Sequence, residues 1–154
     1  MRKLLVVQLG VLSLAMTLLV SAQERKIKKA DLPPAVAKTV ASQSQGATVR
    51  SFSEETENGN TYYEVELRVN GHRKDILMDT DGGVVEVEED VAIDSLPTSV
   101  QVRLQTMSGK GQILKVESLT KHGNLVAYEA QVLTNGTKSE IKVDADGTPL
   151  DHHD

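Results

Sequence analysis

The pentapeptide LPPAV at residues 32–36 returns as LPTSV at residues 96–100. Three further landmarks follow each copy in the same order. They are a Tyr-Glu pair (residues 63–64 and 128–129), an Asn-Gly pair (70–71 and 135–136) and an Asp-x-Asp-Gly turn (79–82 and 144–147). The two copies are 64 residues apart at the first landmark and 65 at the others. Landmarks that recur in a fixed order predict two copies of one structural unit.

Each Leu-Pro pair predicts the start of a helix. Proline is tolerated in a first helical turn, and Asp31 is a suitable N-cap for the first helix. Val36 and Val40 then recur at helical spacing, and the helix is expected to end near Gly46. The second helix is expected over residues 97–107.

After each helix the hydrophobic period changes to two, which predicts antiparallel strands with one buried and one wet face. The Asn-Gly pairs predict tight hairpins between these strands. The fold class predicted is therefore α+β, with two tandem units that each have a helix followed by a four-stranded antiparallel sheet. The fourth strand of the second unit is expected to be a stub at residues 148–150. Both helices are expected on one face of the two sheets, which join or pack together.

The domain boundaries follow from this pattern. Residues 1–22 have a basic start, an apolar run and small residues before Gln23, which together predict a signal peptide. Residues 23–30 are polar and basic and are expected to form a flexible leader. The first unit covers 31–90, a linker 91–95 and the second unit 96–154. The expected location is the periplasm or the medium, with membrane contact only through the signal segment if it stays uncleaved.

Composition excludes several function classes. The 154 residues have a net charge of −5, or about −7 without Arg2 and Lys3, which argues against nucleic acid or an anionic membrane as a partner. The chain has no cysteine, so an exported fold must hold without disulfides. One Phe, three Tyr and no Trp argue against a deep aromatic ligand pocket, and no cofactor is expected.

The order of these motifs resembles that of a PepSY-like domain: a helix opened by Leu-Pro, a Tyr-Tyr-Glu-Val strand (residues 62–65), an Asn-Gly turn and an Asp-x-Asp-Gly turn. The tandem arrangement, over about residues 31–151, is similar to bacterial proteins shaped like β-lactamase inhibitor protein (BLIP). The resemblance implies an exported, non-catalytic module, with a peptidase or another envelope protein as its partner. It also implies a concave sheet that grips this partner. The scarcity of aromatics and the absence of cysteine depart from BLIP itself, so β-lactamase inhibition is not expected.

The candidate partner-binding residues lie on the strands of the first unit. Tyr62, Glu64 and Glu66 occupy the wet positions of one strand, and Glu86 and Glu88 those of another. Acidic side chains of this kind steer a basic partner, or they simply solvate a strand face. Phe52 is either an exposed aromatic anchor or, if its strand has a bulge, a core residue. These six residues form the tentative binding face.

A metal or small ligand is the alternative. Asp79 and Asp81, and their counterparts Asp144 and Asp146, offer carboxylates, but a calcium loop needs a longer run of oxygen ligands. A hairpin turn, in which Asp bonds its own backbone, is the favoured interpretation. The C-terminal pair His152 and His153 offers weak zinc or copper ligands, and a frayed polar tail is favoured over such a site.

No catalytic constellation is recognisable. His72 and His122 fall at turns beside glycines, where no oriented partner for a general base is evident. The chain lacks a nucleophile elbow, a His-Glu-x-x-His motif and a phosphate-binding glycine loop. The sequence therefore predicts a non-enzymatic, exported protein-binding module.

Overall fold

The computed structural model describes residues 23–150. In chain order the elements are β1 (Gln23–Ile27), η1 (Lys29–Asp31), α1 (Pro34–Gln43), β2 (Thr48–Glu57), β3 (Asn60–Val69), β4 (His72–Asp79), β5 (Val84–Asp90), η2 (Ile93–Ser95), α2 (Thr98–Ser108), β6 (Gln112–Lys121), β7 (Asn124–Thr134) and β8 (Thr137–Val143). Each α-helix begins directly after its proline, Pro33 or Pro97, as predicted. Asp31 does not cap α1; it lies in η1 and accepts the backbone N–H of Lys28 at 2.9 Å.

The eight strands form one antiparallel sheet in the order β1 to β8, so each strand pairs with its neighbours in sequence. Four of the hairpins turn through two residues with positive φ: Asn58-Gly59, Asn70-Gly71, His122-Gly123 and Asn135-Gly136. This is the geometry of a type I′ turn, whose twist matches that of the flanking strands. The hairpins predicted at the Asn-Gly pairs are thereby confirmed.

The sheet is continuous across the middle of the chain. In β5, Val87 lies opposite Ile76 of β4 on one side and opposite Thr120 of β6 on the other. The predicted α+β class is confirmed. Of the two arrangements expected for the sheets, joined or packed, the described residues show the joined one, and a separate four-stranded sheet for each unit is not confirmed. Pairing β5 on both sides satisfies backbone groups that two separate sheets would leave on exposed edges.

The order of the elements repeats along the chain. A strand and a short 3-10 helix precede each α-helix, and three strands follow it: β1-η1-α1-β2-β3-β4, then β5-η2-α2-β6-β7-β8. In this order the strand at Val84–Asp90 is the counterpart of β1, but it also pairs with β4, and its Val84 and Val87 pack against the first core, so it is shared by the two halves. Residues 148–150 form no strand among the described residues; they contribute one bridge, between Pro149 and Val143.

Residues 23–30 were expected to be a flexible leader and are instead mostly structured. Strand β1 pairs along β2, where Arg25 binds Glu54 at 3.0 Å and Ile27 packs against the first core. The segment has no apolar stripe of its own, so its structure depends on a partner strand about thirty residues away. Such non-local pairing is not visible in local periodicity.

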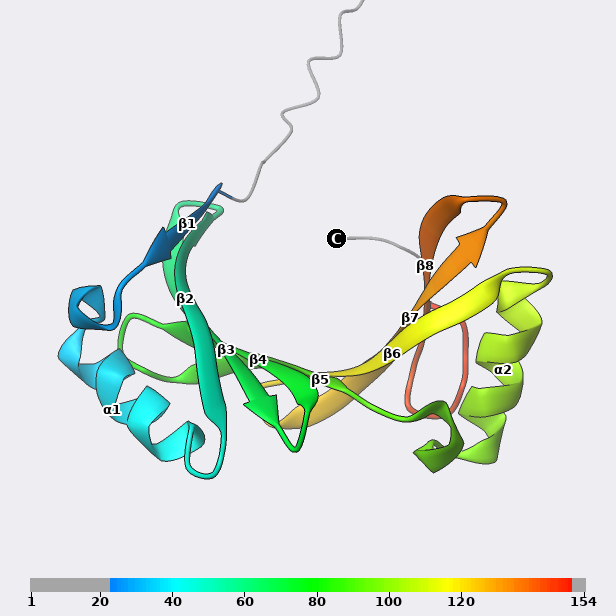
Figure 1. Cartoon of the computed structure of the whole chain (residues 1–154), viewed down its shortest axis with the longest axis horizontal. Coiled ribbons are helices and arrows are strands. Elements are labelled where there is room, and N and C mark those ends of the chain that lie inside the picture. Colours follow the sequence, from blue (N-terminus) through cyan, green and yellow to red (C-terminus); the bar gives the residue numbers. More distant parts are fainter. Residues whose placement is uncertain (1–22, 151–154) are drawn as a thin grey trace, which may run out of the picture.

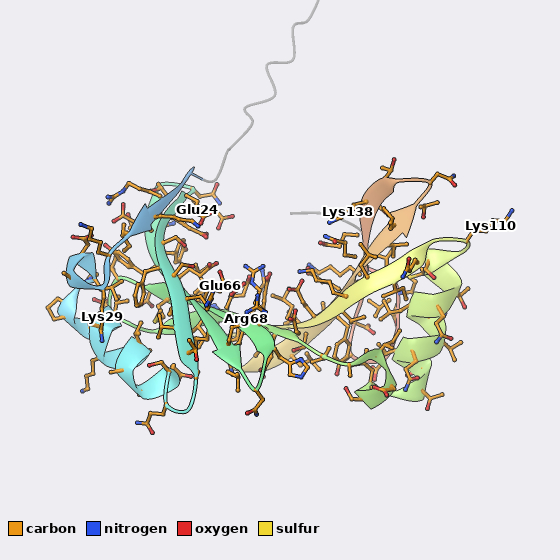
Figure 2. The ribbon with its side chains drawn as sticks, viewed as in Figure 1. Glu24, Lys29, Glu66, Arg68, Lys110 and Lys138 are labelled. Atoms are coloured by element: carbon orange, nitrogen blue, oxygen red, sulfur yellow. The ribbon has the colours of Figure 1, made fainter. Side chains whose placement is uncertain are left out.

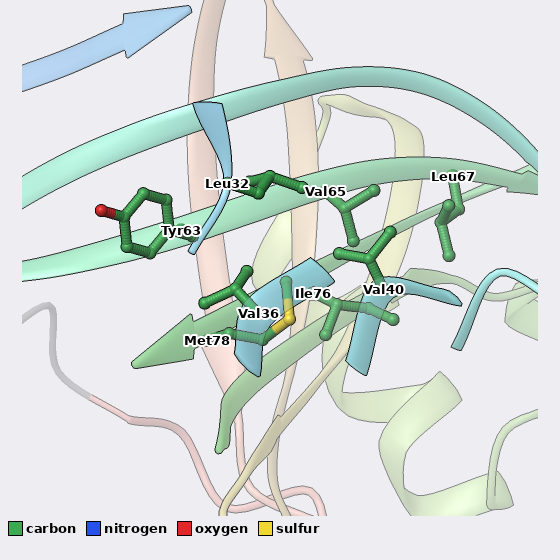
Figure 3. Packing of buried hydrophobic residues seen from close by; sticks show 8 residues of the cluster. All are labelled: Leu32, Val36, Val40, Tyr63, Val65, Leu67, Ile76 and Met78. Atoms are coloured by element: carbon green, nitrogen blue, oxygen red, sulfur yellow. The ribbon is translucent and has the colours of Figure 1, made fainter. Parts of the chain in front are cut away.

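Two hydrophobic clusters hold the helices to the sheet. In the first, Val36 and Val40 of α1 pack on Val65, Ile76 and Met78 of β3 and β4 (Figure 3). In the second, Val100 and Leu104 of α2 pack on the cluster that contains Val116, Ala130 and Val143. Most of these residues are fully buried. Burial of this apolar surface is the main stabilising contribution to each half.

Figure 1 shows the sheet as an open arch, with α1 and α2 on its outer, convex side. The inner, concave face carries no helix in the part of the chain that is described. Both helices therefore cover one face, as predicted. Within residues 23–150, neither helix has the length and apolar content needed to cross a membrane.

Candidate protein-binding face

The alternation of the strands sorts side chains between the two faces of the sheet. In β3, Tyr63, Val65 and Leu67 are buried beneath α1, so Glu64 and Glu66 project from the concave face. Figure 2 shows Glu66 and Arg68 on this side, near the middle of the arch. The register extends the assignment to Asp75 and Leu77 of β4 and to Glu86 and Glu88 of β5.

Most charges on the concave face are paired with a nearby opposite charge, on the same strand, the adjacent strand or, for Arg68 and Asp90, the next strand but one. The ion pairs are Arg68–Glu66, Arg68–Asp90, Arg73–Asp75, Lys115–Glu117, Lys121–Glu86 and Lys142–Glu129. Side chains held in this way on a half-exposed surface contribute little to stability individually. Two of the ion pairs, Lys115–Glu117 and Lys142–Glu129, join acids and bases on β6, β7 and β8.

Three carboxylates on the same face are different. Glu55, Glu64 and Glu88 make no ion pair and no side-chain hydrogen bond with any described residue. They line a cavity of about 210 Å³, which we call the acidic cavity; its walls are Glu55, Glu64, Asp75, Leu77, Glu86 and Glu88. Three consecutive strands, β3, β4 and β5, supply five of these six residues.

The acidic cavity holds its carboxylates in an unfavourable environment. Burial, which is the largest cause, and the charges of Asp75, Glu55 and Glu24 together raise the pKa of Glu64 to about 7, against a smaller lowering by Arg73. Burial also raises the pKa of Glu88 to about 7. The other charges that raise it are those of Glu117, Glu86, Glu129 and Asp75. Desolvation and like charge both disfavour an ionised carboxylate.

The structure brings together five of the six residues predicted for partner binding. Glu64, Glu86 and Glu88 line the acidic cavity, Glu66 lies beside it, and Tyr62 lies at its edge opposite Asp79. Glu86 is paired with Lys121 at 3.0 Å and Glu66 with Arg68 at 3.8 Å.

Phe52 is on the opposite face. The register of β2 and β3 shifts between Val49 and Ser51, and beyond this bulge Phe52 lies opposite Val65 and packs against the first core. The core interpretation of Phe52 is thus the one that the structure supports, because the bulge changes which side chains face α1.

Sequence reasoning missed Asp75 and Leu77 as parts of this site. Leu77 has the apolar side chain of an ordinary strand residue, and nothing in the local sequence sets Asp75 apart from the other polar residues of its strand. Only the register shows that Leu77 lies opposite Glu64 and also opposite Glu86. The available signal was the period of two in β4, counted back from Ile76 and Met78.

The Asp-x-Asp-Gly segments are turns that hold the helices. Asp79 Oδ1 accepts the backbone N–H groups of Asp81 and Gly83, at 3.0 and 2.7 Å. Asp144 Oδ1 does the same for Asp146 and Thr148, at 2.9 and 2.8 Å. Backbone donors at Thr148 and Asp146 also hold the pKa of Asp144 below its ordinary value. The preferred turn interpretation is confirmed, since this hydrogen bonding is that of an Asx-type turn.

The glycine of each turn touches an α-helix. A Cβ on Gly82 would lie 2.7 Å from the carbonyl oxygen of Ala35 in α1, and one on Gly147 would lie 2.9 Å from that of Ser99 in α2. Thr39 donates to the carbonyl of Gly82 at 2.8 Å, which fixes the turn on the helix. The repeated motif thus serves helix packing in both halves.

The described residues give no metal site at the Asp-x-Asp-Gly turns. Among residues 23–150, no group of three or more His, Asp or Glu side chains is placed to hold a metal ion. His72 and His122 are exposed at hairpins. His152 and His153 lie outside the described residues.

Comparison with known proteins gives the fold and no closer relationship. No family model matches the chain, and no curated protein matches it. Among solved structures, a BLIP-like protein from Bacteroides fragilis has a TM-score of 0.59 at 17% identity, with 78% of this chain and 84% of that one covered. A protein of the DUF2874 family from Bacteroides ovatus has a TM-score of 0.63 at 18% identity, with coverages of 78% and 85%.

A third solved structure, of a protein assigned to the periplasm of Bacteroides eggerthii, has a TM-score of 0.65 at 17% identity and covers 78% of this chain and 86% of that one. Identities this low establish a shared fold and nothing about activity. The fold of this chain is therefore BLIP-like: one eight-stranded antiparallel sheet with two helices on its convex face.

Proposed function

We propose that this chain is an exported, non-catalytic module whose concave sheet face binds a protein partner. The observation that carries the proposal is the concave face itself. It is the uncovered side of an eight-stranded sheet, and it holds three carboxylates without partners among the described residues. Unneutralised charge that is partly withdrawn from water is costly to the protein alone and is useful in recognition.

Export is supported by two independent observations. The first 22 residues have the composition of a signal peptide. A solved structure with the same fold is assigned to the periplasm. A periplasmic or secreted location also suits a chain without cysteine, because its two cores form without disulfides.

The class of partner is inferred from the resemblance to PepSY-like domains and from the BLIP-like fold. A peptidase, which the module would restrain or chaperone, is the partner that this resemblance favours. A metal-binding role has less support, because Asp79 Oδ1 and Asp144 Oδ1 each already accept two backbone hydrogen bonds.

Site-specific photo-crosslinking in the envelope of the native host tests the role of the concave face. A photoreactive phenylalanine analogue would replace Tyr62 on that face. The matched control would place the same analogue at Val102 of α2, which is 56% exposed on the convex side. We expect a discrete adduct with one protein species from position 62 and none from position 102.

Adducts from position 102 alone, or no adduct from any of several concave positions, would refute the proposal. Excess unlabelled wild-type protein provides the specificity control, since it should compete away a genuine adduct and leave random labelling unchanged.

A further inference from the structure

We propose that the acidic cavity is the receptor for one lysine or arginine side chain of a partner protein. This inference rests on the proposed function and adds to it the chemistry of the contact. The cavity, at about 210 Å³, is smaller than the roughly 300–1,000 Å³ of typical pockets for drug-sized ligands. Its size therefore suits a single side chain better than a whole small molecule.

A buried acceptor without a donor points to the same ligand. The side chain of Asp75 is only 7% exposed and pairs with Arg73 at 2.6 Å through Oδ2. Asp75 lines the cavity, and its Oδ1 is buried without a hydrogen-bond partner among the described residues, as is Nε of Arg73 in the same ion pair. An unsatisfied buried acceptor costs free energy, and an incoming N–H donor would remove that cost.

The lining matches both parts of a long basic side chain. Glu64 and Glu88 offer carboxylates without a cation, while Leu77 offers an apolar surface between them. Lysine and arginine place an aliphatic stem on apolar surface and a cation beyond it. Arginine would also bind carboxylates through paired N–H groups.

The second half of the chain shows how a cation satisfies such a carboxylate. Glu129 is the repeat counterpart of Glu64, and Lys142, on the adjacent strand, forms an ion pair with it. The position that corresponds to Lys142 is Leu77, which lies opposite Glu64. The first half thus has the carboxylate without the internal cation, and a basic side chain of another molecule would supply it.

A metal ion is a poorer fit than an organic cation. Within residues 23–150, no three carboxylate or imidazole groups are placed to coordinate one ion. An extended guanidinium or ammonium group needs no such convergence, because its donors reach separate acceptors.

The binding should depend on pH. A cation favours the ionised form of Glu64 and Glu88, whose pKa values of about 7 leave both partly protonated at neutral pH. The charged groups that face Glu64 are Asp75, Glu55, Glu24 and Arg73, and those that face Glu88 are Glu117, Glu86, Glu129 and Asp75. Acidic groups predominate around both glutamates. The affinity for a basic side chain should therefore increase from about pH 6 to about pH 8, as Glu64 and Glu88 lose their protons.

Titration of the full-length mature chain with a blocked Gly-Arg-Gly tripeptide tests the proposal by NMR. The matched control is Gly-citrulline-Gly, which has the same shape and no charge. We expect saturable shifts at the carboxyl groups of Glu64 and Glu88, a lower pKa for both at saturation, and no such shifts with citrulline. Affinity should weaken at least tenfold in Leu77→Lys, whose ammonium would occupy the cavity.

The double variant Glu64→Gln/Glu88→Gln keeps the shape of the cavity and should also weaken binding at least tenfold. Lys38→Leu, at an exposed position of α1 on the convex side, should leave the affinity unchanged. Equal shifts with citrulline, full affinity in both cavity variants, or Ca²⁺ binding at the same carboxyls at lower concentration than the tripeptide would overturn the proposal.

The two proposals fail separately. Crosslinks from position 62 without binding of the arginine tripeptide would support the protein-binding face and refute the proposal that the cavity receives a basic side chain. Cation-specific binding of the tripeptide without crosslinks would support the cavity's selectivity for a basic side chain and refute the protein-binding role of the concave face.

Discussion

Glu64 and Glu129 occupy equivalent places in the two halves of the chain, yet their surroundings are opposite. Glu129 is paired with Lys142, whereas Glu64 faces Leu77 and three acidic neighbours. The two cores differ as well: the first buries Leu67, Ile76 and Met78 completely, while Ala130 fills the place in the second core that Val65 fills in the first.

The difference indicates how the duplicated scaffold has diverged. The half with the larger side chains in its core also carries the unneutralised cavity. A site of unpaired carboxylates reduces stability, and a larger buried apolar surface offsets that reduction. Matched substitutions at repeat-equivalent positions separate the contribution of each half.

The largest expected effect concerns the cores. Ile76→Ala should lower the free energy of unfolding by about 4 kcal/mol, because Ile76 is fully buried in the first core. Its counterpart Ile141 is only partly buried against the second core, so Ile141→Ala should cost about 2 kcal/mol. Urea unfolding of both variants measures the difference. Equal losses would show that the two cores are equally well packed.

Substitution of a turn glycine tests the contact between the Asp-x-Asp-Gly turn and its helix, which both halves have. Gly82→Ala should cost about 3 kcal/mol, since its Cβ would meet the backbone of Ala35 in addition to the strain of a positive φ. Gly71→Ala is the control, because Gly71 also has a positive φ but has nothing within 4 Å of the added atom. It should cost about 1 kcal/mol. Thermal unfolding tests this ranking, and a Gly71 variant as damaging as the Gly82 variant would contradict it.

The unpaired acids should make stability decrease as pH increases from about 5 to about 8. Glu64 and Glu88 have pKa values of about 7 in the folded protein against 4.5 ordinarily, so the folded state holds more protons in this interval. Their stabilising contribution is complete below the ordinary value and is lost as pH increases through the folded one. Each should contribute about 1–2 kcal/mol once solvent screening is allowed for.

Glu64→Gln and Glu88→Gln should therefore each stabilise the protein at about pH 8 and flatten the dependence on pH. Glu129→Gln should instead destabilise it by about 0.5 kcal/mol, because it breaks the pair with Lys142. Chemical unfolding across the pH range measures all three variants. A flat profile for the wild type would contradict the assigned pKa values.

The smallest effects are expected from variants that exchange the cross-strand partners of Glu64 and Glu129. Leu77→Lys should lower the pKa of Glu64 towards its ordinary value, and Lys142→Leu should raise that of Glu129 by removing its cation. Carbon-detected NMR titration of the carboxyl groups reports both values. Unchanged pKa values in both variants would show that cross-strand neighbours do not control the charge of this face.

Much of the fold could be predicted from local pattern. Helix starts at Pro33 and Pro97, the alternating strands and the Asn-Gly hairpins all depend on neighbours in sequence, and the structure confirms them. Strand β1 and the role of β5 could not be predicted in the same way, because both depend on pairing with distant segments. The candidate site divides in the same way. The exposed acidic positions of β3 and β5 were predicted from local alternation, whereas Asp75 and Leu77 were missed because only the strand register places them beside these acids.

The sequence by itself determined the repeat, the secondary structure of most of each half and the acidic character of the exposed strand positions. These properties follow from side-chain periodicity and turn chemistry, which act over a few residues. Only the tertiary structure decided that eight strands join in one arch, that a bulge turns Phe52 towards the core, and that Glu64 faces Leu77 while Glu129 faces a lysine. Register sets these relations, and register depends on how whole strands align.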